Sequence, residues 1–257
     1  MQGEFLFWFL AVFAAISVGL GKGGLPVIAG LAVPSLSLVM SPIAAAGLLL
    51  PVYVVSDVFA LLAYRRNYEP KVLRVGVVGL TIGVLIGWAT AHLVLEWVVT
   101  ILIGLMGVLF SAHQMLKTFY KKKKNKPINT NSGYFWCTIA GFTSFISHNG
   151  GPPWQIFALP FGLSKSVFVG TSVIAFSYVN AIKLIPYYFL GQLSFDNLKI
   201  TIYLMLPASI AVYVGFKLVK LIPEKVFFKI VIWALFLISL KLIWDGFKSS
   251  GQIFLIY

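Results

Sequence analysis

The residues best suited to chemistry are a few ionisable side chains that interrupt long apolar runs. Lys22 and Asp57 lie in the first half of the chain, and His148 lies in the second. An ionisable group inside membrane-embedded sequence is costly unless it is paired or hydrated, and it commonly marks an ion pathway or a proton relay. Lys22 and His148 are suited to attracting an anion, and Asp57 and His148 are candidates for proton coupling.

A helix break lies beside each of these polar positions. The sequence reads GGLP at residues 23–26 and GGPP at residues 150–153. Broken helices leave backbone polar groups that survive in a membrane only inside protein or beside a cavity, and matching breaks in two halves point to a transporter's binding site. The prolines suit the first turn of a following half-helix, whose N–H groups carry the positive end of its dipole. Two such ends together predict an anion site, with packing kinks as the alternative.

The predicted substrate site gathers the glycines and polar residues around both breaks. Glycine lets the backbone turn and lets a small ligand approach closely. The candidate binding residues are Gly21, Lys22, Gly23, Gly24, His148, Asn149, Gly150, Gly151, Gln155, Thr171, Ser172 and Asn180.

Structural roles remain open for each charged candidate. Lys22 can instead snorkel from a shallow hairpin or pair with Asp57, Asp57 can serve only as a hydrogen-bonded structural carboxylate, and His148 can be a neutral packing residue. Lys183 can equally belong to a helix surface. The tyrosines and tryptophans away from the breaks are expected to form interfacial belts.

The elements that must position these residues are membrane helices. Of the 257 residues, 60% are hydrophobic and 11% are charged, with a mean hydropathy of +0.94, outside the balance of a soluble domain. Six apolar spans are predicted, at 42–64, 75–92, 97–117, 166–189, 199–217 and 227–246. The stretches 4–39 and 134–163 hold the breaks, and each of their flanks is short for a perpendicular crossing.

Positive charge predicts the topology and the lipid contacts. The net charge is +13, and it gathers near residues 65–74, 121–126 and 217–229, always beside apolar runs. Such clusters face the cytoplasm and its anionic lipid headgroups, and no basic and aromatic surface suggests nucleic-acid binding. All three clusters share one side only if each broken stretch is a re-entrant hairpin; a single kinked helix is the alternative.

Hairpins give each half an odd number of crossings, which predicts inverted repeats. The fold class is therefore an all-α polytopic bundle of two inverted repeats, each a broken hairpin plus three full spans. The first repeat covers residues 1–118, a basic cytoplasmic linker covers 119–133, and the second repeat covers 134–257. Gly47 and Asp57 fall opposite Gly170 and Asn180, which supports the repeat.

Enzyme classes find little support. The sequence has no H-E-x-x-H or G-x-S-x-G motif, three scattered histidines, and one cysteine, Cys137. The G-x-G-x-x-G match at residues 19–24 follows a membrane segment instead of a strand, so it is no dinucleotide fingerprint. We expect a non-enzyme without cofactor or metal, and the sequence indicates no particular oligomeric state.

The break regions resemble the TauE/SafE family of sulfite exporters, also called the TSUP family. The resemblance is carried by GLGKGGLP at residues 19–26, by Asp57, by HNGGPP at residues 148–153, and by Gly170-Thr171-Ser172 with Asn180 and Lys183. It spans nearly the whole chain, and members of the family are usually drawn with seven or eight helices. It implies a secondary transporter of small anions such as sulfite, sulfoacetate or related organosulfonates and carboxylates.

The sequence thus predicts a multi-pass carrier of the bacterial inner membrane that moves a small anion by alternating access. An anion channel on the same scaffold and an accessory subunit without substrate are the alternatives.

Overall fold

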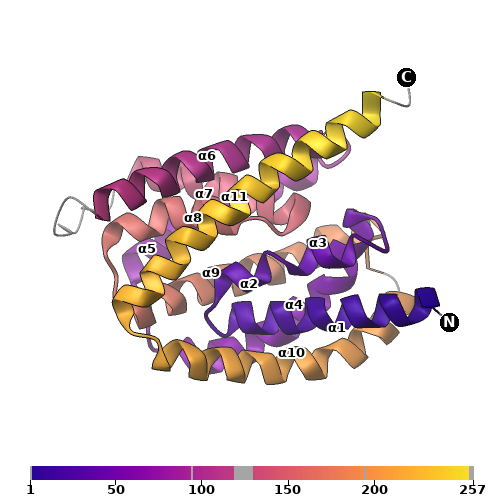
Figure 1. Cartoon of the computed structure of the whole chain (residues 1–257), viewed down its shortest axis with the longest axis horizontal. Coiled ribbons are helices and arrows are strands. Elements are labelled where there is room, and N and C mark those ends of the chain that lie inside the picture. The colour runs from indigo at the N-terminus through magenta and orange to yellow at the C-terminus, as the bar shows by residue number, and fades with distance from the viewer. Residues whose placement is uncertain (1, 94, 119–129, 194, 255–257) are drawn as a thin grey trace.

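The computed structural model describes residues 2–93, 95–118, 130–193 and 195–254. These residues form one helical bundle, and no strand occurs among them (Figure 1). The helices are α1 (Gln2–Lys22), α2 (Pro26–Ala29), α3 (Ala32–Leu36), α4 (Pro42–Tyr64), α5 (Pro70–Ala89), α6 (Glu96–Thr118), α7 (Thr130–Ser147), α8 (Gly151–Ala158), the 3₁₀ turn η1 (Leu159–Phe161), α9 (Lys165–Phe189), α10 (Phe195–Leu221) and α11 (Glu224–Phe254).

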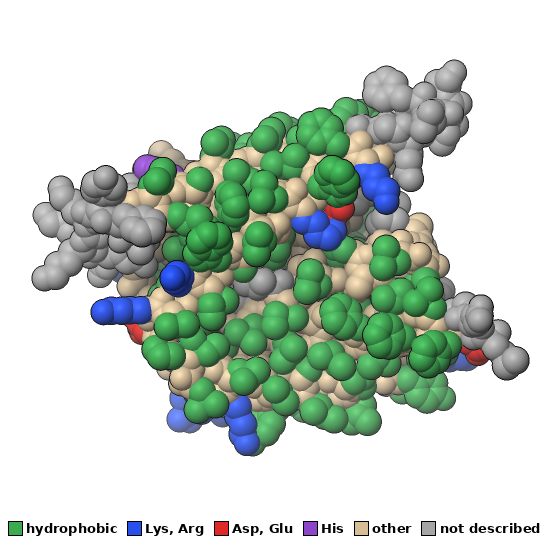
Figure 2. Space-filling view, viewed as in Figure 1, with side chains coloured by type: hydrophobic (Ala, Val, Ile, Leu, Met, Phe, Trp, Pro, Cys, Tyr) green, Lys and Arg blue, Asp and Glu red, His purple; other side chains and the backbone are tan. Residues whose placement is uncertain are grey.

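The six predicted spans correspond to α4, α5, α6, α9, α10 and α11. With α1 they make seven helices in the described part of the chain that are long and apolar enough to cross a membrane. Many of their large apolar side chains point outward, and hydrophobic side chains dominate the face seen in Figure 2. An apolar exterior of this extent needs lipid around it. The chain is an all-α polytopic membrane protein.

The expectation that both flanks of the first break are short is wrong for α1. This helix has 21 residues and continues through Gly19 and Gly21 to Lys22. A Cβ at Gly19 would collide with the Ala208 carbonyl oxygen of α10, so the glycine allows two helix backbones to touch. Close packing of this kind outweighs the helix-weakening effect of a glycine, which is about 1 kcal/mol.

Each broken stretch turns back on itself. After the first break, α2 and α3 run back along α1, and α8 packs against α7 after the second (Figure 1). The turn is tight, because a Cβ on Gly21 would meet the side chain of Ala29. The geometry at both breaks is that of a hairpin.

The two halves pack through matching partners. Helix α1 lies against α10 as α7 lies against α5, and α4 contacts α9 while α6 contacts α11. Gly47, near the start of α4, touches the Gln192 carbonyl just beyond α9. Gly170, near the start of α9, touches the Asn67 carbonyl just beyond α4. Helices α4 and α9 therefore run antiparallel through the centre of the bundle.

Two of the three basic clusters lie at the same end of the bundle. The Glu69 N–H after α4 donates to Thr171 Oγ1 near the start of α9 (2.9 Å). Lys165, which begins α9, reaches the connection between α10 and α11. The Arg65–Arg74 and Lys217–Lys229 clusters are thereby brought together, as the topology prediction requires. The linker lysines at 121–126 lie outside the described residues.

Lys165 provides the first testable prediction. Its Nζ donates to the Val219 carbonyl (2.5 Å) and the Ile222 carbonyl (2.6 Å) at the C-terminal end of α10. Cations stabilise this end of a helix, and a hydrogen bond from a charged group contributes about 1.5–3 kcal/mol. Lys165→Met is expected to lower the midpoint of thermal unfolding in detergent by a few degrees. The exposed Lys225→Met serves as control, and equal midpoints for both variants would contradict the capping role.

Candidate functional site

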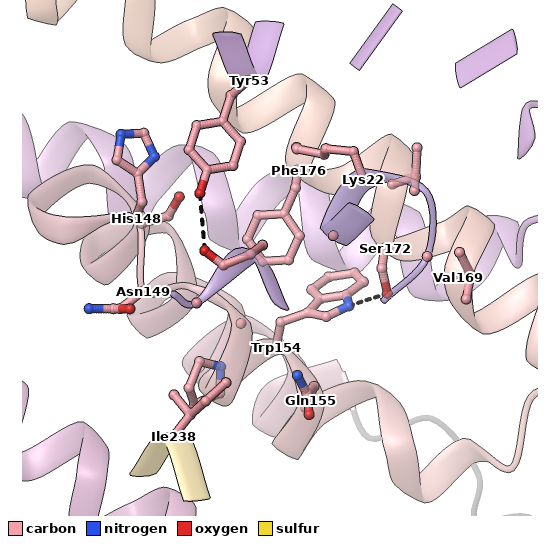
Figure 3. Close-up of a pocket in the computed structure, with 18 of the residues that line it drawn as sticks. Lys22, Tyr53, His148, Asn149, Trp154, Gln155, Val169, Ser172, Phe176 and Ile238 are labelled. Carbon is pink, nitrogen blue, oxygen red and sulfur yellow. Dashed lines mark hydrogen bonds between the residues drawn. The ribbon is translucent and has the colours of Figure 1, made fainter. Parts of the chain in front are cut away.

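A cavity of about 120 Å³ lies where the two breaks meet. Its wall includes Gly21, Lys22 and Gly24 from the first break and His148, Asn149 and Gly151 from the second. The end of α2 and helices α4, α7, α8, α9 and α11 supply the rest of the lining (Figure 3). Because about 10–15 Å³ of such space holds one water, the cavity admits a small ion with several waters. Both halves of the chain contribute to one chamber.

Lys22 and Asp57 form a buried ion pair behind one wall of the cavity. The Lys22 Nζ lies 2.5 Å from Asp57 Oδ1. Ser177 Oγ donates to the same oxygen (2.9 Å), and Asn180 Nδ2 donates to Asp57 Oδ2 (2.7 Å). All three partners are donors, so both carboxylate oxygens of Asp57 accept. Asp57 does not line the cavity, whereas Lys22 and Asn180 do.

His148 occupies the second break in a conformation rare for its residue type. Its φ is +56°, the only positive φ of a non-glycine residue among those described, and Gly24 takes a positive φ (+116°) at the first break. Left-handed backbone costs a residue with a Cβ about 1–2 kcal/mol, and such strain concentrates at functional sites. The ring stacks on Tyr53 with centroids 4.9 Å apart. Its Nε2 lies 3.2 Å from the Ala46 carbonyl, which can only accept, so Nε2 carries a proton.

Lys183 lies beside His148 and is fully buried (0% exposed), which excludes the helix-surface interpretation. Its Nζ contacts His148 Nδ1 (3.0 Å), the Ser144 carbonyl (2.9 Å) and Ser144 Oγ (3.3 Å). Among the described residues, no carboxylate lies within ion-pair distance of this nitrogen. The buried lysine and acidic side chains in the described part of the chain are thus Lys22, Lys183 and Asp57.

Much of the cavity wall is apolar and aromatic. Trp154 is 1% exposed, and its indole N–H donates to Ser172 Oγ (2.7 Å). Phe168, Val169, Phe176 and Ile238 add apolar surface. Figure 3 shows Tyr53 and His148 at one end and Trp154 and Gln155 at the other. The cavity thus has a cationic end near Lys22 and an apolar side.

Nine of the twelve predicted binding residues line this cavity: Gly21, Lys22, Gly24, His148, Asn149, Gly151, Gln155, Ser172 and Asn180. The other three lie elsewhere. Gly23 is packed against α10 and its carbonyl accepts from Tyr64 (2.7 Å), and Gly150 is packed against α7. Thr171 caps the connection after α4. These three residues shape the surroundings of the chamber without facing it.

The predicted pair of half-helix N-termini is present on one side only. Helix α8 has eight residues and begins at the cavity, but α2 has only four. Pro152 and Pro153 have no N–H, and the Trp154 N–H is already bonded to the Gly150 carbonyl (3.2 Å). Few backbone donors remain to bind an anion. Positive charge at the cavity comes mainly from the Lys22 side chain.

Sequence reasoning placed neither Trp154 nor Tyr53 in the site, and it left Lys183 open between the interior and a helix surface. Trp154 follows the double proline directly, which is a signal that it begins the half-helix lining the cavity. On α9 the cavity residues Val169, Ser172, Phe176 and Asn180 recur at helical spacing, and Lys183 continues that stripe by three residues. The stripe could have placed Lys183 on the interior face.

No curated protein and no solved structure matches the chain. A family model described as sulfite exporter TauE/SafE matches residues 5–242, which include both breaks and every residue that lines the cavity. The chain therefore belongs to the sulfite exporter TauE/SafE family of membrane transporters.

Proposed function

We propose that this protein is a secondary carrier that moves a small anion across the bacterial cytoplasmic membrane by alternating access. The anion is sulfite or a small organosulfonate or carboxylate. The observation that carries the proposal is a cavity to which both helix breaks contribute, with Lys22 and His148 on its wall. A chamber between two repeats, lined by broken helices, is the arrangement found in carriers that rock one repeat against the other.

The direction of helix packing supports two inverted repeats. The packing at Gly104 places the middle of α6 against the later part of α11. The packing at Gly246 places the start of α6 against the end of α11. Helices α6 and α11 are therefore antiparallel, like α4 and α9. Corresponding helices of inverted repeats must run in opposite directions. The repeats cover 1–118 and 134–257, joined by the linker 119–133, whose lysines contact anionic lipid.

In this carrier Lys22 attracts the anion, while the side-chain amides of Asn149, Gln155 and Asn180 offer N–H groups to its oxygens. The Ser172 hydroxyl donates to the Phe168 carbonyl and accepts from Trp154, so it positions the indole. The apolar wall around Trp154 and Phe176 accommodates the anion's less polar side. The Lys22–Asp57 pair gives the binding charge without leaving an isolated ammonium in the membrane. Anion binding then competes with Asp57 for the same Nζ.

The test is uptake of labelled anions by purified protein in proteoliposomes. We expect saturable uptake of sulfite or a small sulfonate and its acceleration by unlabelled anion on the opposite side, with chloride carried poorly. Acceleration by the opposite side is the signature of a carrier, because a channel shows none. Flux that rises linearly with concentration would indicate that the protein is a channel instead of a carrier. Absence both of flux and of a thermal-stability shift with these anions would contradict an anion site.

A further inference from the structure

The charge balance of the interior points beyond anion binding. Lys22, Asp57 and Lys183 are the buried lysine and carboxylate side chains among the described residues. Asp57 is already matched to Lys22 at 2.5 Å. A charged Lys183 would therefore add one uncompensated positive charge to the middle of the membrane protein, which is costly. The empty cavity favours a neutral Lys183, and a cavity holding an anion favours a charged one.

The hydrogen bonds around Lys183 fit both forms of the side chain. As an amine, Nζ donates to the Ser144 carbonyl and to His148 Nδ1, and its lone pair accepts from the Ser144 hydroxyl. As an ammonium, it donates to all three atoms, which lie 2.9, 3.0 and 3.3 Å away. The Ser144 hydroxyl can reverse its role because it is both donor and acceptor. No hydrogen bond is lost when the proton arrives.

Ser144 also connects Lys183 to the cavity. Ser144 lines the chamber and Lys183 does not. A proton from hydronium in the cavity can add to Ser144 Oγ while the hydroxyl's own proton passes to the Nζ lone pair. One O–H bond of hydronium breaks, one N–H bond forms on Lys183, and water remains. The reverse transfer releases the proton to water on the other side.

We propose that Lys183 is the proton-carrying residue of this carrier, taking up one proton through Ser144 for each univalent anion bound. The inference rests on the proposed anion transport. His148 holds the lysine in place: its Nε2 proton is directed at Ala46 and its Nδ1 receives the lysine. Anion and proton then cross together, so the loaded and the empty cavity carry equal charge.

The other titratable groups on Lys183's own helix and on the helices packed against it are paired, exposed or on other turns. Lys22 and Asp57 act on it electrostatically from α1 and α4, and they oppose each other. On its own helix, the Tyr187 ring lies 5.8 Å from Nζ, and the Tyr187 hydroxyl donates to the Phe145 carbonyl. The basic residues of α5, Lys71 and Arg74, are exposed near its start. Tyr134 and Cys137 lie on earlier turns of α7, and on α11 Lys241 pairs with Asp245.

The test compares two fluxes of labelled methanesulfonate, whose charge does not change with pH, in proteoliposomes of the full chain. Exchange needs only the loaded carrier, whereas net uptake also needs the empty carrier to reorient. Hydrogensulfite in mildly acidic buffer is the probe if methanesulfonate is not carried. In wild type we expect lumen acidification of one proton per anion and no dependence of net uptake on membrane potential.

Lys183→Arg fixes the positive charge, because arginine stays protonated. We expect exchange within about threefold of wild type and net uptake reduced about 100-fold, since the empty carrier must then move an uncompensated charge. Ser144→Ala is expected to slow net uptake about tenfold and leave exchange intact, because the proton path is interrupted. The exposed Lys225→Met is the matched control and should keep both fluxes.

Proton coupling through Lys183 is overturned if wild-type net uptake generates a membrane potential and leaves the lumen pH unchanged. It is also overturned if folded Lys183→Arg retains proton-coupled net uptake, or if folded Ser144→Ala shows net uptake at the wild-type rate. The wild-type measurement decides even where a variant does not fold. If the wild-type protein exchanges neither methanesulfonate nor hydrogensulfite, the proposed carrier function itself is contradicted. Failure of proton coupling and failure of the carrier function are therefore distinguishable.

Discussion

Replacing Lys22 by methionine is expected to abolish anion uptake and to destabilise the protein strongly. The substitution leaves Asp57, which is 4% exposed, with its charge but without the ammonium at 2.5 Å. Ser177 and Asn180 remain as partners but carry no charge. Removing one member of a buried ion pair typically costs about 3–5 kcal/mol. We expect a large fall in the thermal midpoint and no measurable uptake of labelled sulfite or sulfonate.

A double variant separates the two effects of this change. Lys22→Met with Asp57→Asn removes both charges, so most of the stability should return. Anion uptake should not return, because the cationic end of the cavity is lost. Lys122→Met in the linker is the control and should transport normally. Uptake by the double variant at the wild-type rate would show that Lys22 serves folding alone.

Where the chain breaks could be predicted from sequence because the signal is local. Paired glycines followed by proline weaken a helix wherever they stand. The six spans were equally accessible, since length and hydropathy decide them. The length of α1 could not be predicted from the sequence, because Gly19 and Gly21 look like helix breakers until α10 and α2 are seen to pack on them. At Gly19 that packing depends on Ala208, nearly 200 positions away.

The candidate site likewise contains residues that could be predicted from the sequence and residues that only the fold reveals. Lys22, His148 and Gln155 were found because they adjoin the breaks in sequence. The sequence did not distinguish the roles of Thr171 and Ser172. Because successive residues point in different directions around a helix, Ser172 faces the cavity and Thr171 faces the connection after α4. The partners of Lys183 are Ser144 and His148, which lie more than 30 positions earlier. Only the fold brings these residues together.

The packing of α5 on α7 gives the other large expected effect. A Cβ at Gly83 would collide with the Thr138 carbonyl oxygen and lie 2.6 Å from the Phe142 nitrogen and 2.9 Å from the Gly141 Cα. These are backbone atoms, so they cannot turn aside as a flexible side chain would. Helices that meet through small residues must separate to admit a larger one, and they lose contacts along the whole crossing.

Gly83→Val is therefore expected to destabilise the protein by more than about 3 kcal/mol and to prevent recovery of monodisperse protein, with Gly83→Ala intermediate. Ile82→Val, on the half-exposed face of the same turn (43% exposed), should change little. Size-exclusion profiles and thermal midpoints in detergent measure the series. Normal behaviour of Gly83→Val would contradict the close crossing.

Gly19 in the α1–α10 crossing extends this experiment to the other half. Its Cβ would meet the backbone of Ala208 as that of Gly83 meets Thr138. If the halves are equivalent repeats, Gly19→Val should reproduce the loss seen with Gly83→Val, because each crossing joins a broken hairpin to the middle span of the other repeat. A mild effect at Gly19 alone would mean that the two crossings are not equivalent. The hairpins would then be held unequally, and the carrier would have one rigid and one mobile side.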